Sequence, residues 1–170
     1  MRTATFTGML AGIALLAATV QTAAATDTAR AAMSDVHGKS VGEVTLTRTP
    51  HGTLLHARLT GLPAGAHAFH VHTVGRCEPP FKSAGGHFNP HGVKHGILAE
   101  DGVHAGDMPN IHVPGSGALE VEVLNTFMEL DAILFDDDGA AIVIHAGPDD
   151  YRTDPAGAAG PRIACGVITK

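Results

Sequence analysis

Three common features are scarce or missing in this 170-residue sequence. Beyond residue 25, no apolar run approaches the roughly 20 residues of a membrane-spanning helix, which argues against insertion into a membrane. No window repeats apolar residues at the helical period, which argues against a helical fold. Basic residues are in the minority, with 11 Lys and Arg against 17 Asp and Glu, so nucleic acids and anionic membranes are poor partners.

The N-terminal 25 residues differ from the rest of the chain. Arg2 is followed by an apolar run from Gly8 to Val20 and then by Ala23-Ala24-Ala25, a small-residue spacing typical of a cleavage site. We interpret residues 1–25 as a signal peptide, with an uncleaved anchor as the alternative. Its removal takes away Arg2 and leaves 10 basic against 17 acidic residues, a net charge of −7. The mature protein is therefore expected in the periplasm or outside the cell.

Cysteine is also scarce, because Cys77 and Cys165 are the only two. In an oxidising compartment such a pair usually bridges, so we expect one disulfide between them. Two free, buried thiols are the alternative.

Apolar residues beyond residue 38 alternate with polar ones at the period of two that is typical of half-buried strands. The alternation is seen at Val44 and Leu46, at Leu55, Ala57 and Leu59, and at Leu119, Val121 and Val123. Short apolar runs at residues 130–135, 141–145 and 163–168 extend the strand pattern. The sequence thus predicts an all-β sandwich or barrel at residues 39–170, preceded by a loose N-terminal arm at residues 26–38.

Two connections between predicted strands, at about residues 73–117 and 146–162, are much longer than turns. Connections of such length in a compact domain usually carry function. Histidines and a carboxylate gather in and around them. His70 and His72 alternate in a predicted strand and so point to the same side. The set is completed by His87, His95, His104, Asp107 and His145.

Seven such residues exceed the four ligands that one tetrahedral zinc accepts, so either some are idle or two ions bind. Imidazole suits both copper and zinc, and a set that includes a carboxylate favours zinc. If His87 served both ions, it would use both ring nitrogens and lose its ring proton. It would then be a bridge with a latent site for a proton.

The segments around these residues match the motifs of a known family in residue type and in spacing. They are Phe69-His70-Val71-His72, Gly86-His87-Phe88-Asn89-Pro90, Lys94-His95-Gly96, His104-Ala105-Gly106-Asp107, Val143-Ile144-His145, and Gly160 through Ile168. With them the chain closely resembles the copper/zinc superoxide dismutase family, in particular its exported bacterial members. The resemblance implies that residues 39–170 form an eight-stranded Greek-key β-barrel or sandwich with two long functional loops.

The resemblance also implies a role for each site residue. Copper would be bound by His70, His72, His87 and His145, and zinc by His87, His95, His104 and Asp107, with one ion of each kind per chain. His87, as the bridge, and Arg162, beside the copper, would be the catalytic residues. Asp149 would hydrogen-bond one ligand of each ion, His70 and His95. Cys77 and Cys165 would form the disulfide within the subunit.

The implied activity is the dismutation of superoxide to dioxygen and hydrogen peroxide at copper, with zinc as a structural ion. It would make the protein an antioxidant of the cell envelope, acting as a monomer or homodimer. A non-catalytic periplasmic carrier or chaperone for copper and zinc on the same fold is the alternative. Arg76, and Ala158 where the family usually has Asn, depart from the pattern without removing a ligand. His67 and His91 are expected to lie outside both sites.

Overall fold

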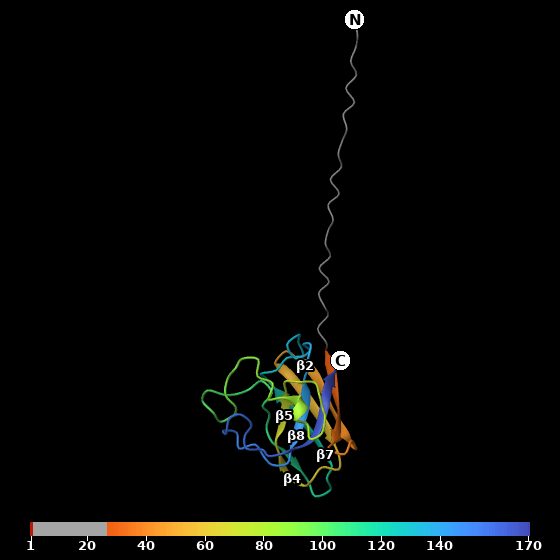
Figure 1. The fold of residues 1–170 in the computed structure, drawn as a ribbon, viewed down its shortest axis with the longest axis vertical. Coiled ribbons are helices and arrows are strands. Elements are labelled where there is room, and N and C mark those ends of the chain that lie inside the picture. Colours follow the sequence, from red (N-terminus) through yellow and green to blue (C-terminus); the bar gives the residue numbers. More distant parts are fainter. Residues whose placement is uncertain (2–26) are drawn as a thin grey trace.

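Nine strands account for most of the regular structure in the part of the chain that the computed structural model describes, Met1 and residues 27–170 (Figure 1). The predicted signal peptide lies outside these residues, apart from Met1. The strands are β1 (Thr28–Asp35), β2 (Ser40–Thr49), β3 (Gly52–Leu59), β4 (Gly65–His67), β5 (Phe69–His72), β6 (Ile111–Val113), β7 (Leu119–Asn125), β8 (Ala141–His145) and β9 (Arg162–Thr169). One short 3-10 helix, η1 (Lys82–Ala84), follows β5.

Seven strands form one antiparallel sheet in the order β5-β8-β9-β1-β2-β3-β7, and β4 pairs with β6 in a small second sheet. The large sheet curls, and the two long connections project together from one side of it (Figure 1). The prediction of an all-β fold with two long loops is confirmed. The described residues hold seven plus two strands where eight were expected. Among these residues no helix has the length and apolar character needed to cross a membrane.

Strands β2, β3 and β7 follow the predicted alternation. Leu46 on β2, Leu55 on β3 and Val123 on β7 lie in register across the sheet and turn toward the same core. Leu46 and Leu55 are fully buried, and Val123, on the edge strand, is half-buried. Apolar residues at every second position of the sequence therefore lie on one face of the sheet, because successive side chains of a strand point to opposite faces.

The predicted loose arm at residues 26–38 is wrong. Residues 28–35 form β1, which lies inside the sheet between β2 and β9. Its inward residues are Ala29, Ala31 and Met33, all buried. Two of these three are alanines, whose small side chains give only a weak apolar signal, so the sequence shows no clear alternation in this segment. The domain therefore begins before residue 39.

The apolar run at residues 130–135 is not a strand. The side chain of Asp131 accepts hydrogen bonds from the backbone N–H groups of Ile133 and Leu134, and its carbonyl accepts one from Phe135. An aspartate that bonds to the backbone just after it favours a turn over a strand. The run still contributes to the core, because Leu130 and Leu134 are buried.

Strand β8 is buried at all five positions. Ile142 and Ile144 face the main core, whereas Ala141 and Val143 pack with Phe81, Ala84 and Cys165 in a small second cluster. Part of the first long connection thus covers the outer face of β8. This arrangement places that connection against the strand that ends at His145.

Candidate metal centre

Strands β5 and β8 position three of the predicted ligands. The two strands pair antiparallel, and the backbone N–H of His145, at the end of β8, donates to the Ala68 carbonyl just before β5 at 3.0 Å. His70 and His72 are separated by one residue and so project from the same side of β5. These three histidines are held by backbone ladders that need no metal.

The first long connection returns to the other edge of β5. Val71 donates to the Gly106 carbonyl at 2.9 Å and accepts from the Phe88 N–H at 2.8 Å. Gly106 in turn donates to the Phe88 carbonyl at 2.8 Å. Because His87 precedes Phe88 and Asp107 follows Gly106, this pairing brings both predicted ligands beside β5.

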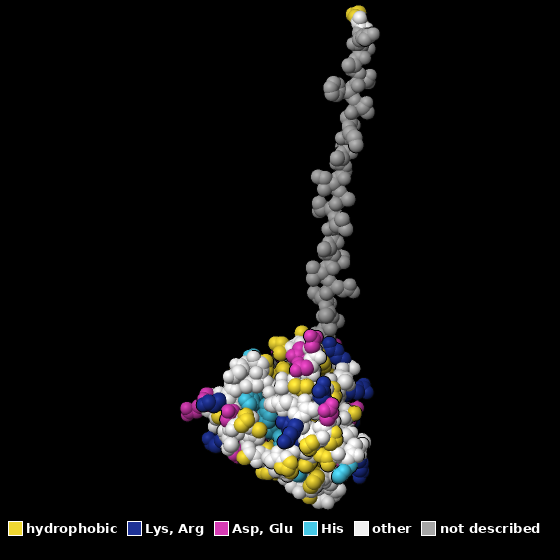
Figure 2. All heavy atoms as spheres, viewed as in Figure 1, with side chains coloured by type: hydrophobic (Ala, Val, Ile, Leu, Met, Phe, Trp, Pro, Cys, Tyr) yellow, Lys and Arg dark blue, Asp and Glu magenta, His cyan; other side chains and the backbone are white. Residues whose placement is uncertain are grey.

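All seven predicted ligands meet in two buried clusters. The first comprises His70, His72, His87 and His145, and the second comprises His87, His95, His104 and Asp107. Within each cluster the candidate ligand atoms lie within 4.8 Å of one another. His87 belongs to both. Histidine side chains are visible together on one face of the molecule, with a basic side chain beside them (Figure 2).

Backbone carbonyls fix the orientation of two rings. His72 donates from Nδ1 to the Gly85 carbonyl at 3.0 Å, and His145 donates from Nδ1 to the Gly160 carbonyl at 3.1 Å. A carbonyl can only accept, and a neutral imidazole has one N–H, so the lone pair lies on Nε2 in both rings. The two Nε2 atoms face each other at 3.5 Å. Two ring lone pairs thus converge in the first cluster.

Asp149 links the two clusters. Its buried carboxylate accepts from His70 Nε2 at 2.8 Å and from His95 Nε2 at 3.0 Å. His70 then presents Nδ1 as the acceptor nitrogen toward the first cluster, whereas His95 directs Nδ1 toward Asp107 Oδ2 in the second, at 3.0 Å. A carboxylate behind an imidazole in this way orients it and raises its basicity as a ligand. The predicted hydrogen bonds of Asp149 are therefore present.

His87 differs from the other rings because both its nitrogens point into clusters. Nδ1 lies 2.7 Å from Asp107 Oδ1 and 3.4 Å from His104 Nδ1. Nε2 is buried on the side of the first cluster and has no hydrogen-bond partner, and neither has Nδ1 of His70. Buried polar atoms without a partner are costly, so these two nitrogens suit a bound cation. The donor sets, four imidazoles and three imidazoles with a carboxylate, fit copper and zinc respectively.

Burial sets the charge of the first cluster. It lowers the pKa of His70 and of His145 to about 4, and it lowers the pKa of His72 well below its ordinary value. Nearby cationic groups, Arg162 among them for His72 and His145, act in the same direction. At pH 7 these rings are neutral, which is the form that binds a metal.

Carboxylates set the charge of the second cluster. Burial opposes ionisation of Asp107, yet hydrogen bonds from His87 and His95 hold the pKa of its carboxyl far below the ordinary range. Burial likewise opposes ionisation of Asp149, whose pKa is lowered by hydrogen bonds from His70 and His95. Against the effect of burial, the two carboxylates raise the pKa of His95 to about 9. In the metal-free chain at pH 7 the centre therefore holds two ionised carboxylates with a protonated His95 between them, and a bound cation would take the place of that proton.

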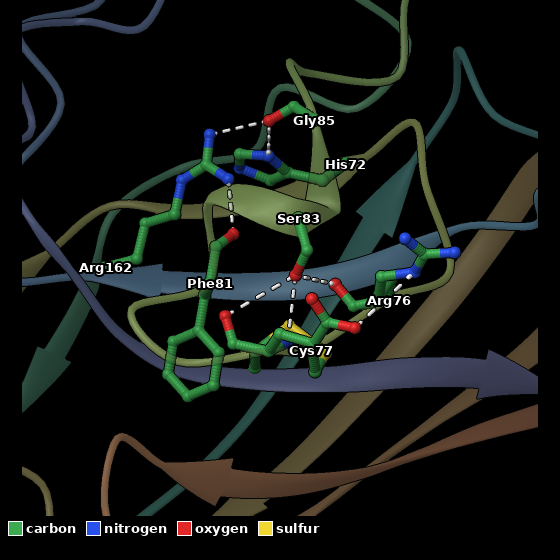
Figure 3. Close-up of a disulfide and its surroundings, with 9 residues drawn as sticks. His72, Arg76, Cys77, Phe81, Ser83, Gly85 and Arg162 are labelled. Atoms are coloured by element: carbon green, nitrogen blue, oxygen red, sulfur yellow. Dashed lines mark hydrogen bonds and ion pairs between the residues drawn. A yellow bond between two sulfur atoms is a disulfide. The ribbon is translucent and has the colours of Figure 1, made fainter.

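Arg162, the first residue of β9, lies beside the first cluster (Figure 3). Its guanidinium donates to the carbonyls of Phe81 and Gly85, each at 2.6 Å. The Gly85 carbonyl also accepts from His72, so the cation and a predicted copper ligand share one anchor. A cavity of about 410 Å³, lined by His145 and by residues of the segment 153–160, opens next to this cluster.

The predicted disulfide is confirmed. Cys77 and Cys165 are bonded, with a Cα–Cα distance of 5.7 Å and a sequence separation of 88 (Figure 3). The bond ties the first long connection to β9, close to the carbonyl of Phe81 that holds Arg162.

His67 and His91 lie outside both clusters, as expected. The two ring nitrogens of His67 lie 2.9 Å from the backbone carbonyl oxygens of His145 and Pro63, so neither nitrogen is available to a metal ion. His91 lines a separate surface pocket with Phe127 and Glu129.

Three residues that support the centre were missed in the sequence. Asp154 accepts from the backbone N–H of His95 at 2.8 Å, and Asn110 bonds to the backbone of Asp149. Gly157, with φ of +63°, packs so closely that a Cβ on it would lie 1.8 Å from Asp149 Oδ1. None of them stands at a metal-ligand spacing, and a loop residue that bonds to distant backbone leaves no periodic signal.

Comparison with known proteins agrees with this geometry. The family model described as copper/zinc superoxide dismutase (SODC) matches residues 40–168. A Cu-Zn superoxide dismutase of Aquifex aeolicus is 51% identical over 146 residues, which cover 82% of this chain and 85% of that protein. A Cu-Zn superoxide dismutase of Caulobacter vibrioides is 46% identical over 138 residues, covering 77% and 79%.

A solved structure is similar as well. The crystal structure of a SOD-like protein from Bacillus subtilis superposes with a TM-score of 0.79 at 34% identity, covering 82% of this chain and 97% of that one. The fold, the two clusters and the extent of these matches lead to one conclusion. The chain belongs to the copper/zinc superoxide dismutase family.

Proposed function

We propose that this protein is an exported superoxide dismutase with one copper and one zinc ion per chain. Copper would be held by His70, His72, His87 and His145, and zinc by His87, His95, His104 and Asp107. The observation that carries the proposal is the sharing of His87 by two buried clusters of different donor type. A storage protein has no need of a ring that faces two sites at once, whereas a catalyst that moves a proton has.

The reaction converts two superoxide anions and two protons into dioxygen and hydrogen peroxide. Copper bound at the first cluster supplies the one-electron redox couple, and zinc at the second has no redox chemistry of its own. The residues of the chain must then attract the anion, deliver a proton and keep the ligands oriented.

Arg162 is suited to attracting and orienting the anion. Its guanidinium is always charged and carries five N–H donors in a planar fork. Bonds to the carbonyls of Phe81 and Gly85 fix its position beside His72 and leave further donors for a small anion. Because salt screens exposed charges beyond roughly 8–10 Å, the last steps of approach depend on this local cation and not on the net charge.

His87 is suited to delivering a proton. Asp107 holds its Nδ1 at 2.7 Å, while its Nε2 faces the first cluster without a partner. A proton on Nε2 would therefore face the departing peroxide and could pass to it over a short path. Asp149 keeps His70 and His95 in place on either side during that transfer.

The location we propose is the periplasm or the exterior of the cell. The signal-like residues 1–25 and the disulfide both support export, because a bond such as Cys77–Cys165 persists in oxidising compartments. There the enzyme would protect the cell envelope from superoxide.

The proposal is tested by metal analysis of the purified mature protein together with its rate of superoxide decay. Activity should rise in proportion to copper content and be indifferent to zinc content once the fold is intact. If the protein binds both metals but superoxide decays no faster than it does in buffer without the protein, the protein is a carrier instead.

Charge reversal at Arg162 tests its role. Arg162→Glu should slow decay far more than Arg162→Leu, with copper and zinc contents unchanged. Arg58→Glu is the matched control, because it makes the same change in net charge on the exposed surface of β3. If both Glu variants slow the reaction equally at low ionic strength, only the overall charge matters and local steering by Arg162 is refuted.

A further inference from the structure

The side chain of Asn110 forms two hydrogen bonds with the backbone of Asp149, the residue that links the two clusters. Its side-chain carbonyl accepts from the Asp149 N–H at 2.8 Å, and its side-chain NH₂ donates to the Asp149 carbonyl at 2.9 Å. Asn110 lies just before β6 and three residues after Asp107, in the first long connection, whereas Asp149 lies in the second. One amide group therefore joins the two connections at the point where the clusters meet.

Tyr151 forms hydrogen bonds with both Asn110 and Asp149. Its hydroxyl accepts from the backbone N–H of Asn110 at 2.7 Å, and its own backbone N–H donates to Asp149 Oδ1 at 2.6 Å. Its carbonyl accepts from the N–H of Leu98 at 3.1 Å, again in the first connection. Asn110, Asp149 and Tyr151 thus close a ring of hydrogen bonds that uses side chain and backbone of each loop.

The backbone of Tyr151 shows that this ring constrains the loop. Its φ of 62° lies in the left-handed region, which bulky side chains rarely adopt. Such a conformation persists only where several contacts determine it together. Gly157 lies so close to the Asp149 carboxylate that a Cβ on it would fall 1.8 Å from Oδ1, the oxygen that also accepts from the Tyr151 N–H. Two residues of the second connection therefore confine this oxygen.

We infer that Asn110 and Tyr151 are positioning residues, which hold Asp149 so that its two oxygens meet His70 and His95 at the same time. The inference rests on the proposed function, in that the two rings are taken as ligands of different ions. In the described part of the chain, no hydrogen bond joins Asn110 or Tyr151 to a predicted ligand ring. They act through Asp149, and they make the placement of the first connection and the geometry of both metal sites interdependent.

The test compares three variants of the copper- and zinc-loaded protein. Asn110→Ala removes both side-chain bonds to Asp149, and Tyr151→Phe removes only the hydroxyl. Thr53→Val is the matched control, because the buried Thr53 hydroxyl donates to the Met128 carbonyl at 2.8 Å, and neither residue belongs to the two connections that carry the centre. Its loss should lower stability without touching the centre.

Two readouts separate positioning from stability. Outer partners of metal ligands typically contribute about 10- to 100-fold in metal affinity. Release of zinc to an excess of chelator should therefore quicken by about 10-fold in Asn110→Ala and by a smaller factor in Tyr151→Phe. The electron paramagnetic resonance spectrum of Cu(II) in the first cluster should shift in the same order, through His70. Thr53→Val should lower the urea midpoint and leave both readouts unchanged.

Tyr151 itself provides a third readout, because the chain has one tyrosine and no tryptophan. Acrylamide should quench its fluorescence more efficiently in Asn110→Ala than in the wild type, as the loop loosens. Zinc release and copper spectra identical to the wild type in both Asn110→Ala and Tyr151→Phe would overturn the inference. A wild-type protein that takes up no copper or zinc would instead overturn the proposed function, and metal analysis before the comparison tells the two failures apart.

Discussion

The curled sheet and the two long connections are stabilised by different means. In the sheet, backbone ladders join seven strands around an apolar core that contains Leu46, Leu55 and Ile142. In the connections, which run from residue 73 to 110 and from 146 to 161, buried residues are often polar, and side chains such as Asp107 and Asp149 bond to rings and backbone. The sheet can therefore form without ions, whereas the connections are ordered by the same contacts that build the metal centre.

This difference explains the location of the centre. Asp107 illustrates it, because its Oδ2 accepts from the backbone N–H groups of Gly96 and His104, each at 3.1 Å. The carboxylate that would bind zinc is thus also the group that folds the loop. Ordering of the connection and assembly of the site are one process, while the sheet supplies the fixed positions of His70, His72 and His145.

The largest effect is expected from a cavity in the sheet. Leu55→Ala should lower the free energy of unfolding of the metal-free protein by about 2–5 kcal/mol, because the fully buried side chain packs in the main core. Urea denaturation measures the loss. Metal contents of the folded, reloaded variant should equal those of the wild type. A variant that stays as stable as the wild type would show that the sheet is not the independent unit described here.

Loss of the disulfide should affect the connections before the sheet. The double variant Cys77→Ser, Cys165→Ser should be less stable by about 2–4 kcal/mol. Hydrogen exchange should first lose protection in residues 73–86, which the bond ties to β9, while β2 and β3 stay protected. Equal loss of protection in residues 73–86 and in β2 and β3 would contradict the view that the sheet and the connections are stabilised by different means.

Acid should destabilise the metal-free protein through the centre. The pKa values of His70 and His145 are about 4 in the folded chain, against an ordinary value of 6.5. Between these values the unfolded chain binds more protons than the folded one, so the free energy of unfolding falls as pH falls from 6.5 to 4. His95 acts on the other side, because its raised pKa of about 9 contributes stability that is lost as pH rises from 6.5 through 9.

Urea titrations of the metal-free protein at a series of pH values should therefore show greatest stability near pH 6.5. His145→Gln, which does not titrate, should flatten the acid limb. An acid limb of unchanged slope in this variant would show that other groups control it.

The smallest effect is expected at Ala158, which has a φ of 51°. This left-handed conformation costs a residue with a Cβ about 1 kcal/mol, and Gly adopts it freely. Ala158→Gly should therefore raise the free energy of unfolding by about 0.5–1 kcal/mol. Ala156→Gly in the same connection, where φ is not positive, should give no gain. Equal effects of the two changes would refute local strain at residue 158.

The sequence predicted the sheet better than its boundaries. Alternating leucines and valines identified β2, β3 and β7, because large side chains at period two leave a strong signal. Alanines on β1 did not, and the turn held by Asp131 interrupted an apolar run that looked like a strand. Short strands such as β4 and β6, with three residues each, are below the length at which alternation can be seen.

The centre was predicted through its chemistry. Histidines and a carboxylate at unusual spacing identified all seven members of the clusters, and a family resemblance divided them between two sites. The roles of Asn110 and Asp154 were not predicted, because these residues hydrogen-bond to backbone groups that lie 39 and 59 positions away in the sequence. Such partners are set by how the two connections meet, which no local pattern encodes.

The most direct test of the account is the metal content of two variants that each alter one cluster. His145→Ala removes a residue of the first cluster alone, and Asp107→Ala removes one of the second alone. After loading with both metals and dialysis, mass spectrometry should find that His145→Ala retains zinc and loses copper and activity. Asp107→Ala should retain copper, lose zinc and show reduced hydrogen-exchange protection in residues 73–110. Equal loss of both metals in both variants would contradict the division into two sites that share His87.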